Sequence, residues 1–132
     1  MILVDTSVLI DFLRSRNNPK PQLLEEILER KNLWGITNFI YQEILQGAKD
    51  GNEFNRLKEY FETVPSYSLK FGRQSFERAA LLNVRCRNAG VTIRSTIDLL
   101  IAETAIENDL ALLHNDSDFD SMSKIVQELR IF

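Results

Sequence analysis

Acidic residues recur in this sequence where short apolar runs end or where helices are expected to begin. These acids are Asp5, Glu43, Asp98, Asp116 and Asp118. Asp5 follows the apolar run at residues 1–4, and Asp116 follows a similar run at 110–113. Because residues beyond the carboxyl ends of parallel strands converge on one crevice, we expect these acids to meet there. Gathered carboxylates repel one another unless hard cations separate them, so the pattern predicts a divalent-metal site.

Each of these acids also has an ordinary structural explanation. Asp5 and Asp98 can stabilise the starts of helices. Asp116 and Asp118 can form a turn, and Glu43 can lie on a solvated helix face. However, Asp5, Glu43 and Asp98 all border apolar residues, where a charge without a partner is costly. Metal coordination explains the acids together and is therefore the preferred interpretation.

The types of ligand narrow the choice of metal and of chemistry. Oxygen ligands without histidine or thiolate favour Mg²⁺ or Mn²⁺ over zinc. Such cations serve phosphate chemistry, because they lower the pKa of a water and offset the negative charge of the transition state. The sequence leaves open whether one ion or two bind.

The composition is that of a globular chain. The 132 residues, 44% of them hydrophobic, predict a single domain over residues 1–132. Cys86 is the only cysteine, which excludes a disulfide within the chain and a thiolate zinc cluster. No secretory signal and no apolar stretch of about 20 residues is visible, so we expect a cytoplasmic location away from membranes. The net charge of −3 argues only weakly against a nucleic-acid partner, because 16 basic residues face 14 acidic ones once the five acids are set aside.

Apolar runs and helical patterns alternate along the chain. The predicted strands are 2–5, 33–36, 63–69, 110–114 and 127–132. The predicted helices are 6–14, 23–32, 37–51, 54–62, 71–88, 95–106 and 117–122, with a loop at 17–21. This alternation predicts an α/β fold, with a central parallel sheet of about five strands and helices on both faces. Pro65 predicts that the third strand lies at an edge.

Four segments of the sequence resemble the signature segments of the PIN-domain nucleases. They are residues 1–10, 37–48, 98–102 and 114–119. The small size and the Glu-x-x-x-Gly-Ala segment that begins at Glu43 resemble the VapC toxins of bacterial and archaeal toxin–antitoxin pairs. The resemblance spans nearly the whole chain and keeps the family's order and spacing, so it implies a PIN-like fold.

The resemblance implies a role for each acid and for three polar neighbours. The residues that correspond to the family's catalytic, metal-binding acids are Asp5, Glu43, Asp98 and Asp116, with Asp118 as an accessory metal ligand. The supporting polar residues are Thr6, Ser7 and Asn115. Thr6 and Ser7 follow Asp5 and can hold metal-bound water or the Asp5 carboxylate. Asn115 stands beside Asp116.

The resemblance also implies an activity and partners. The activity is Mg²⁺- or Mn²⁺-dependent endonucleolytic cleavage of structured or single-stranded RNA, which leaves 5′-phosphate and 3′-hydroxyl ends. The partners are a second copy of the chain and a cognate VapB-type antitoxin that blocks the active site, commonly with a basic side chain. DNA is contacted through the antitoxin. Neither the RNA target nor the antitoxin can be read from the sequence.

Two other functions stay open at this point. A phosphatase or phosphotransfer domain also places aspartates at strand ends, but it normally needs a lysine late in the chain. Lys124 is the only late lysine, and it does not follow a strand. The second is a catalytically silent PIN-like module for RNA binding or assembly. Such a module would be expected to have lost some of the catalytic acids, whereas Asp5, Glu43, Asp98 and Asp116 are all present.

Other polar residues near the acids have weaker functional signals. His114 is the only histidine, and we expect a structural role because the sequence offers it no orienting partner. Arg85, Arg87 and Arg94 precede Asp98 and could bind phosphates, although the first two are expected to lie on a solvated helix face.

Overall fold

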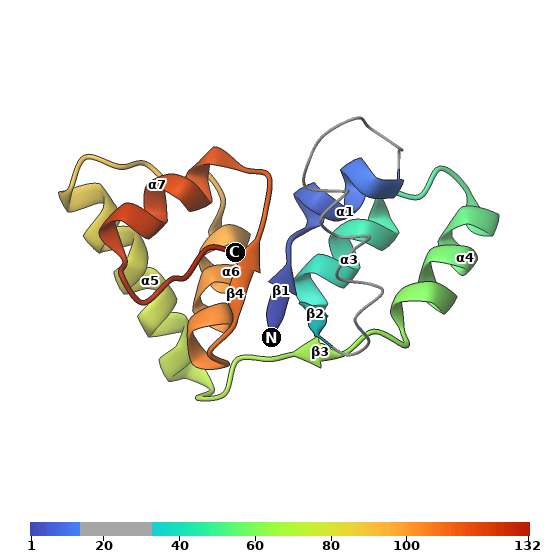
Figure 1. Cartoon of the computed structure of the whole chain (residues 1–132), viewed down its shortest axis with the longest axis horizontal. Coiled ribbons are helices and arrows are strands. Elements are labelled where there is room, and N and C mark those ends of the chain that lie inside the picture. Colours follow the sequence, from blue (N-terminus) through green and yellow to red (C-terminus); the bar gives the residue numbers. More distant parts are fainter. Residues whose placement is uncertain (14–32) are drawn as a thin grey trace.

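The computed structural model of the chain describes residues 1–13 and 33–132 (Figure 1). The loop predicted at 17–21 and the helix predicted at 23–32 lie outside the described residues. The strands are β1 (Ile2–Val4), β2 (Trp34–Thr37), β3 (Ser66–Tyr67) and β4 (Ala111–Leu113). The helices are α1 (Thr6–Leu13), α3 (Asn38–Gln46), α4 (Gly51–Phe61), α5 (Arg73–Asn88), α6 (Thr96–Glu107) and α7 (Ser117–Ile125).

The four strands form one parallel sheet in the order β3-β2-β1-β4. The first strand therefore lies inside the sheet, and its Ile2 pairs with Trp34 on one side and Ala111 on the other. All three residues of β1 are buried, as expected for a strand covered on both faces. The predicted α/β class with a parallel sheet is confirmed, and Asp5 follows a central strand.

The C-terminal segment contributes less to the sheet than predicted. Only Leu112 and Ile131 form a parallel bridge there, with hydrogen bonds of 2.8 Å from Leu112 N to Arg130 O and from Phe132 N to Leu112 O. The chain first turns at Leu129, whose N–H donates to the carbonyl of Val126 at 3.1 Å. The described sheet therefore has four strands and one bridge.

The edge position predicted for the third strand is confirmed, and it explains a glycine. β3 lies at the end of the sheet beside β2. A Cβ atom on Gly35 would come within 2.5 Å of the Tyr67 ring and 2.6 Å of the Pro65 carbonyl oxygen. Glycine at this position in β2 therefore permits the close approach of β3.

The helices form two groups around the sheet. In Figure 1, α5, α6 and α7 gather on the side of β4, and α1, α3 and α4 gather on the side of β2. Helix α6 is buried over 99–105, because it lies inside the first group. In residues 1–13 and 33–132, no helix has both the length and the apolar character that crossing a bilayer requires.

The predicted helix over 37–51 is shorter in the structure. Helix α3 ends at Gln46, and α4 begins at Gly51. The reason is a new cap, because the Asp50 side chain accepts a hydrogen bond of 2.8 Å from Glu53 N. Such a cap satisfies a free N–H at the start of α4 and favours a break in the chain direction.

A pair of glutamates joins α6 to the start of α5. Glu107 Oε1 accepts hydrogen bonds from Lys70 N at 2.6 Å and from Ser75 Oγ at 3.0 Å. Glu103 is buried, at 3% exposure, and stands one helical turn before Glu107. Burial raises the pKa of Glu103 to about 8, and its hydrogen bond with Glu107 adds to the rise. Burial alone would raise the pKa of Glu107 too, but the hydrogen bonds it accepts, first from Glu103, lower it.

This pair predicts that stability depends on pH. Glu103 holds a proton in the folded chain up to a pH of about 8, whereas in the unfolded chain it loses that proton near its ordinary pKa of 4.5. The free energy of unfolding should therefore fall as pH rises through this window, by at most about 1.4 kcal/mol per pH unit for this one proton. Urea unfolding at several pH values measures the slope.

Glu103→Gln should lose the contribution of Glu103 to the slope, because an amide can still donate to Glu107 but does not titrate. Glu77→Gln, on the exposed side of α5, is the matched control and should keep the slope of the unmodified chain. Equal slopes in Glu103→Gln and in the unmodified chain would contradict the assignment.

Candidate functional site

Asp5 joins the central strand to α1 at the carboxyl edge of the sheet. In Figure 1 the carboxyl ends of β1 and β4 point toward the region between α1 and α7. Asp5 Oδ2 accepts hydrogen bonds from Ser7 N at 3.1 Å and from Ser7 Oγ at 2.6 Å. Burial raises the pKa of Asp5, and the Ser7 bonds oppose this rise. The carboxylate is thus held in place by the start of the next helix.

Glu43 comes from the neighbouring helix and faces Asp5. Helix α3 begins after its N-cap Thr37, whose hydroxyl accepts a hydrogen bond of 3.1 Å from Ile40 N. Burial, followed by the negative charge of Asp5, raises the pKa of Glu43. The Thr6 hydroxyl lies close enough to lower that pKa. Capping by Thr37 therefore sets the helix that brings Glu43 to the edge of the sheet.

Asp98 has a raised pKa, and the other four predicted acids all contribute to the rise. It lies in the first turn of α6, after Ser95 at the N-cap position. Burial, and then the charges of Asp5, Asp116, Glu43 and Asp118, raise its pKa to about 7. The structure therefore brings all five predicted acids into one electrostatic group, which we call the acidic cluster. Its members are Asp5, Glu43, Asp98, Asp116 and Asp118.

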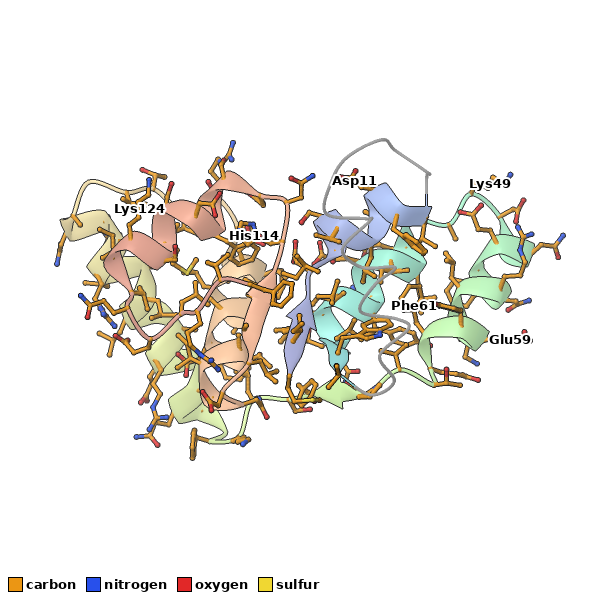
Figure 2. All side chains as sticks on the ribbon, in the orientation of Figure 1. Asp11, Lys49, Glu59, Phe61, His114 and Lys124 are labelled. Carbon is orange, nitrogen blue, oxygen red and sulfur yellow. The ribbon has the colours of Figure 1, made fainter. Side chains whose placement is uncertain are left out.

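Asp116 is positioned by the only histidine of the chain. His114 is fully buried at the end of β4, and its Nδ1 accepts a hydrogen bond of 3.0 Å from Asp116 N. An acceptor at Nδ1 places the ring proton on Nε2, which stands 3.1 Å from Asp120 Oδ1. Figure 2 shows His114 beside α7, whose N-cap is Asp116. His114 thus has a positioning role in the structure.

Asp118 has a cation of its own within the cluster. Arg94 donates from N and Nε to Asp118 Oδ2 at 3.3 and 3.2 Å, and from Nη2 to Oδ1 at 3.2 Å. These bonds lower the pKa of Asp118. In the sequence, Arg94 stands within one helical turn of Asp98, yet the structure pairs it with Asp118. Both oxygens of the predicted accessory ligand therefore already have a partner.

A hydrogen-bonded bridge, which sequence reasoning missed in part, connects the two sides of the cluster. Asn115 N donates to Ser7 Oγ at 2.9 Å, and Asn115 Nδ2 donates to Asp11 Oδ2 at 2.7 Å. Asp11 is buried on α1, where Figure 2 labels it near the carboxyl edge of the sheet. The missed signal is a charged residue one helical turn after Ser7 in an otherwise apolar helix. The bridge ties the loop before Asp116 to α1.

The donor set fits a hard divalent cation in chemistry and charge. All five side chains of the cluster offer carboxylate oxygens, and the buried Thr6 hydroxyl makes no well-formed hydrogen bond among the described residues. In the side-chain conformations of residues 1–13 and 33–132, no three acids, histidines or cysteines converge on one metal-binding point. The acids are therefore electrostatic neighbours, and a ligand sphere requires some of them to turn toward a shared ion.

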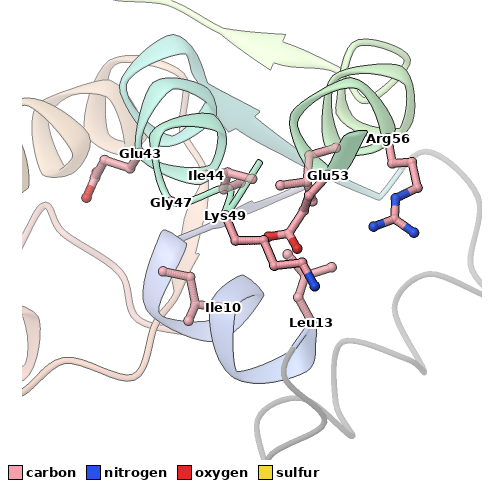
Figure 3. Close-up of a pocket in the computed structure, with 9 residues that line it drawn as sticks. Ile10, Leu13, Glu43, Ile44, Gly47, Lys49, Glu53 and Arg56 are labelled. Carbon is pink, nitrogen blue, oxygen red and sulfur yellow. The ribbon is translucent and has the colours of Figure 1, made fainter. Parts of the chain in front are cut away.

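A pocket opens beside Glu43 between α1, α3 and α4. It has a volume of about 570 Å³. Figure 3 shows Glu43 at one end of it and Lys49, Glu53 and Arg56 toward the other. Ile10, Leu13 and Leu57 add apolar surface. The acidic cluster thus adjoins a hollow of mixed charge.

Comparison with known proteins agrees with this fold. The PIN domain family model matches residues 2–125. Ribonuclease VapC11 of Mycobacterium tuberculosis is 32% identical over 126 residues, which cover 95% of this chain and 93% of that protein. The fold is similar to a chain of VapBC2 from Rickettsia felis bound to a DNA fragment from their promoter, with a TM-score of 0.74, 19% identity and coverage of 100% and 98%. A toxin–antitoxin complex from Klebsiella pneumoniae gives a TM-score of 0.69 at 21% identity, with coverage of 99% and 100%.

The family model matches most of the chain, and the identity to VapC11 extends over nearly all of it. The arrangement of strands and helices in the structure agrees with that fold. The chain therefore belongs to the PIN-domain family, and within it to the VapC proteins.

Ser7→Ala should destabilise the protein, because it removes the hydroxyl that donates to Asp5 and accepts from Asn115 N. Loss of a hydrogen bond to a charged group corresponds to about 1.5–3 kcal/mol in the free energy of unfolding. Urea unfolding of the variant and of the unmodified chain measures this loss of unfolding free energy. Ser123→Ala is the control, because Ser123 donates only to the Asp120 carbonyl on the surface, and about 0.5 kcal/mol is expected there. Equal losses in both variants would contradict the bridging role of Ser7.

Proposed function

We propose that this chain is a metal-dependent endoribonuclease that acts as the toxin of a toxin–antitoxin pair. The observation that carries the proposal is the clustering of Asp98 with Asp5, Glu43, Asp116 and Asp118, whose charges, after burial, raise the pKa of Asp98 to about 7. The identity to a VapC ribonuclease supports RNA as the substrate. The acids fit the hydrolysis of RNA because they can hold cations. Phosphodiester hydrolysis builds up negative charge in the transition state, and bound cations offset that charge.

The proposed metal ligands and catalytic acids are Asp5, Glu43, Asp98 and Asp116. A bound Mg²⁺ or Mn²⁺ supplies an activated water and stabilises charge on the leaving oxygen. The chain's own residues hold and orient these ligands. Ser7 fixes the Asp5 carboxylate, and Asn115 ties Ser7 to the loop of Asp116. Thr6, with its buried hydroxyl, is proposed as a supporting polar group near Glu43.

Asp118 is proposed as a supporting acid of the same site. Its oxygens pair with Arg94, so its charge contributes less to repulsion within the cluster than that of an unpaired carboxylate. Its backbone N–H donates to Asp116 Oδ1 at 2.9 Å. Asp118 thus orients the Asp116 carboxylate at the start of α7, whether or not it also contacts an ion.

The raised pKa of Asp98 makes protons compete with cations in this site. Near neutral pH, a proton on Asp98 relieves part of the repulsion from its neighbours. A divalent cation relieves the same repulsion and requires the deprotonated carboxylate. Metal affinity should therefore increase as pH rises through about 7.

The proposed partners follow from the relatives. Chains of this fold occur in VapBC2 bound to promoter DNA and in a toxin–antitoxin complex. We propose that residues 1–132 form a single domain that is cytoplasmic, pairs with a second copy and binds a VapB-type antitoxin, with DNA contacted through the antitoxin. The pocket beside Glu43 is a suitable place for an antitoxin side chain, because it opens directly onto a proposed ligand.

The phosphotransfer alternative receives no support from the position of its candidate lysine. Lys124 lies in the last turn of α7, whose N-cap is Asp116. The two residues are eight positions apart, which corresponds to roughly 12 Å along a helix axis. Lys124 is also exposed, and Figure 2 shows it at the side of the molecule. It therefore does not serve the acidic cluster.

Asp5→Asn and Asp98→Asn should each lower RNA cleavage at least about 100-fold while the protein stays folded, because each removes a charged ligand and keeps its shape. Cleavage of total RNA in Mn²⁺, with the 5′ ends sequenced, measures the effect and reveals the target. Glu59→Gln, an exposed position on α4, is the matched control and should cleave as the unmodified chain does. Full cleavage by both aspartate variants would reject the proposed roles.

Millimolar Mn²⁺ should raise the melting temperature above its value in chelator, because an ion that binds only the folded chain stabilises it. The stabilisation is about 2.7 kcal/mol at a concentration 100 times Kd. The shift should be larger at pH 8 than at pH 6, because the pKa of Asp98 is about 7. Asp98→Asn should reduce the shift, and Glu59→Gln should not. An unchanged melting temperature at both pH values would contradict a metal site.

A further inference from the structure

Arg94 is a basic residue of the acidic region that the proposed metal chemistry does not use. It lies directly before Ser95 and helix α6, whose first turn carries Asp98. The charges of Asp116 and Asp98 both act on its guanidinium, after the dominant contact with Asp118. Arg94 therefore stands at the same edge of the sheet as the proposed ligands.

The ion pair with Asp118 fixes the direction of the guanidinium. The Asp118 side chain is only 12% exposed, whereas the Arg94 side chain is 73% exposed. Nε and Nη2 bind the carboxylate, so one planar edge of the guanidinium faces inward. The backbone N–H of Arg94 bonds the same carboxylate and fixes the start of the side chain as well. The result is an arginine with a set orientation on the surface.

The outward part of this guanidinium keeps donors for a ligand. An arginine side chain carries five N–H donors, and the contacts with Asp118 use two of them. The donors on Nη1 form the next fork of the planar group, and such a fork matches two oxygens of a phosphate. An anionic strand that approaches the acids at this edge thus meets oriented positive charge.

The other described arginine–carboxylate pairs differ in position. Arg85 pairs with Glu128 through two bonds of 2.7 and 3.2 Å, between the last turn of α5 and the C-terminal segment. Arg130 pairs with Asp109, which follows the C-terminal end of α6, whereas Asp98 lies in its first turn. Among residues 1–13 and 33–132, Arg94 is thus the arginine that is paired within the acidic cluster.

We propose that Arg94 is a phosphate-binding residue that positions the RNA strand beside the acidic cluster, with Asp118 as the residue that orients its guanidinium. The inference rests on the proposed ribonuclease function and adds a contact to a phosphate next to the scissile one. Its oriented donors offset the repulsion between the acids and the incoming strand. A fixed fork also loses less freedom on binding than a mobile lysine does.

The test compares cleavage of a mixed-sequence single-stranded RNA oligonucleotide in Mn²⁺ at several salt concentrations. Arg94→Ala should raise KM about tenfold and change kcat by less than about twofold, because the contact serves binding. The slope of log(kcat/KM) against log(salt) should become shallower by about 0.7, the value for one lost phosphate contact on a single strand. Arg94→Lys should raise KM less, because it keeps the charge and loses the fork.

Arg85→Ala is the matched control, because it also removes a bidentate pair with a carboxylate. It should leave KM and the salt slope unchanged. If Arg94→Ala lowers only the melting temperature and keeps the KM and salt slope of the unmodified chain, Arg94 is a structural clamp and the inference is overturned. If the unmodified chain fails to cleave this RNA, the proposed function fails with it. Cleavage that requires Asp98 but not Arg94 overturns the present inference alone.

Discussion

Repulsion among carboxylates at one edge of a parallel sheet is the constraint on which the rest of this structure depends. It acts at Asp98, whose pKa is raised to about 7 by burial first and then by the charges of four neighbouring acids. Like charges in a partly buried place destabilise a fold unless protons, hydrogen bonds or cations offset them. Much of the architecture around the site supplies such offsets.

Helix starts provide one such offset. Asp5 stands immediately before α1, Asp98 lies in the first turn of α6, and Asp116 is the N-cap of α7. The N-terminal end of a helix carries partial positive charge and free N–H groups, which stabilise a nearby carboxylate. The parallel topology directs these helix starts to the same edge, since each follows a strand end or a connecting loop there. The fold that brings the acids together therefore also offsets part of the repulsion between them.

Side-chain partners provide the other offset and divide the cluster into distinct environments. Ser7 donates a hydrogen bond to Asp5, and Arg94 forms an ion pair with Asp118. Asp98 has no comparable partner among the causes that determine its pKa, which burial and then the neighbouring acids raise to about 7. A proton or a cation is therefore what can offset the charge of Asp98. The same division explains why one cluster can contain both a proposed metal site and a cationic edge for a phosphate.

The amino-acid sequence by itself determined the class of fold and indicated the acids that the structure places in one electrostatic group. Apolar runs and Pro65 were local signals, and the parallel sheet with β3 at its edge agrees with them. Only the tertiary structure decided the partners: Arg94 bonds Asp118, 24 positions away, and Asn115 bonds Asp11, 104 positions away. Periodicity and capping act over one or two helical turns, whereas these contacts depend on how the strands and helices are placed in space. The short C-terminal bridge and the early end of α3 likewise follow from competing local turns and caps that hydrophobic pattern alone does not weigh.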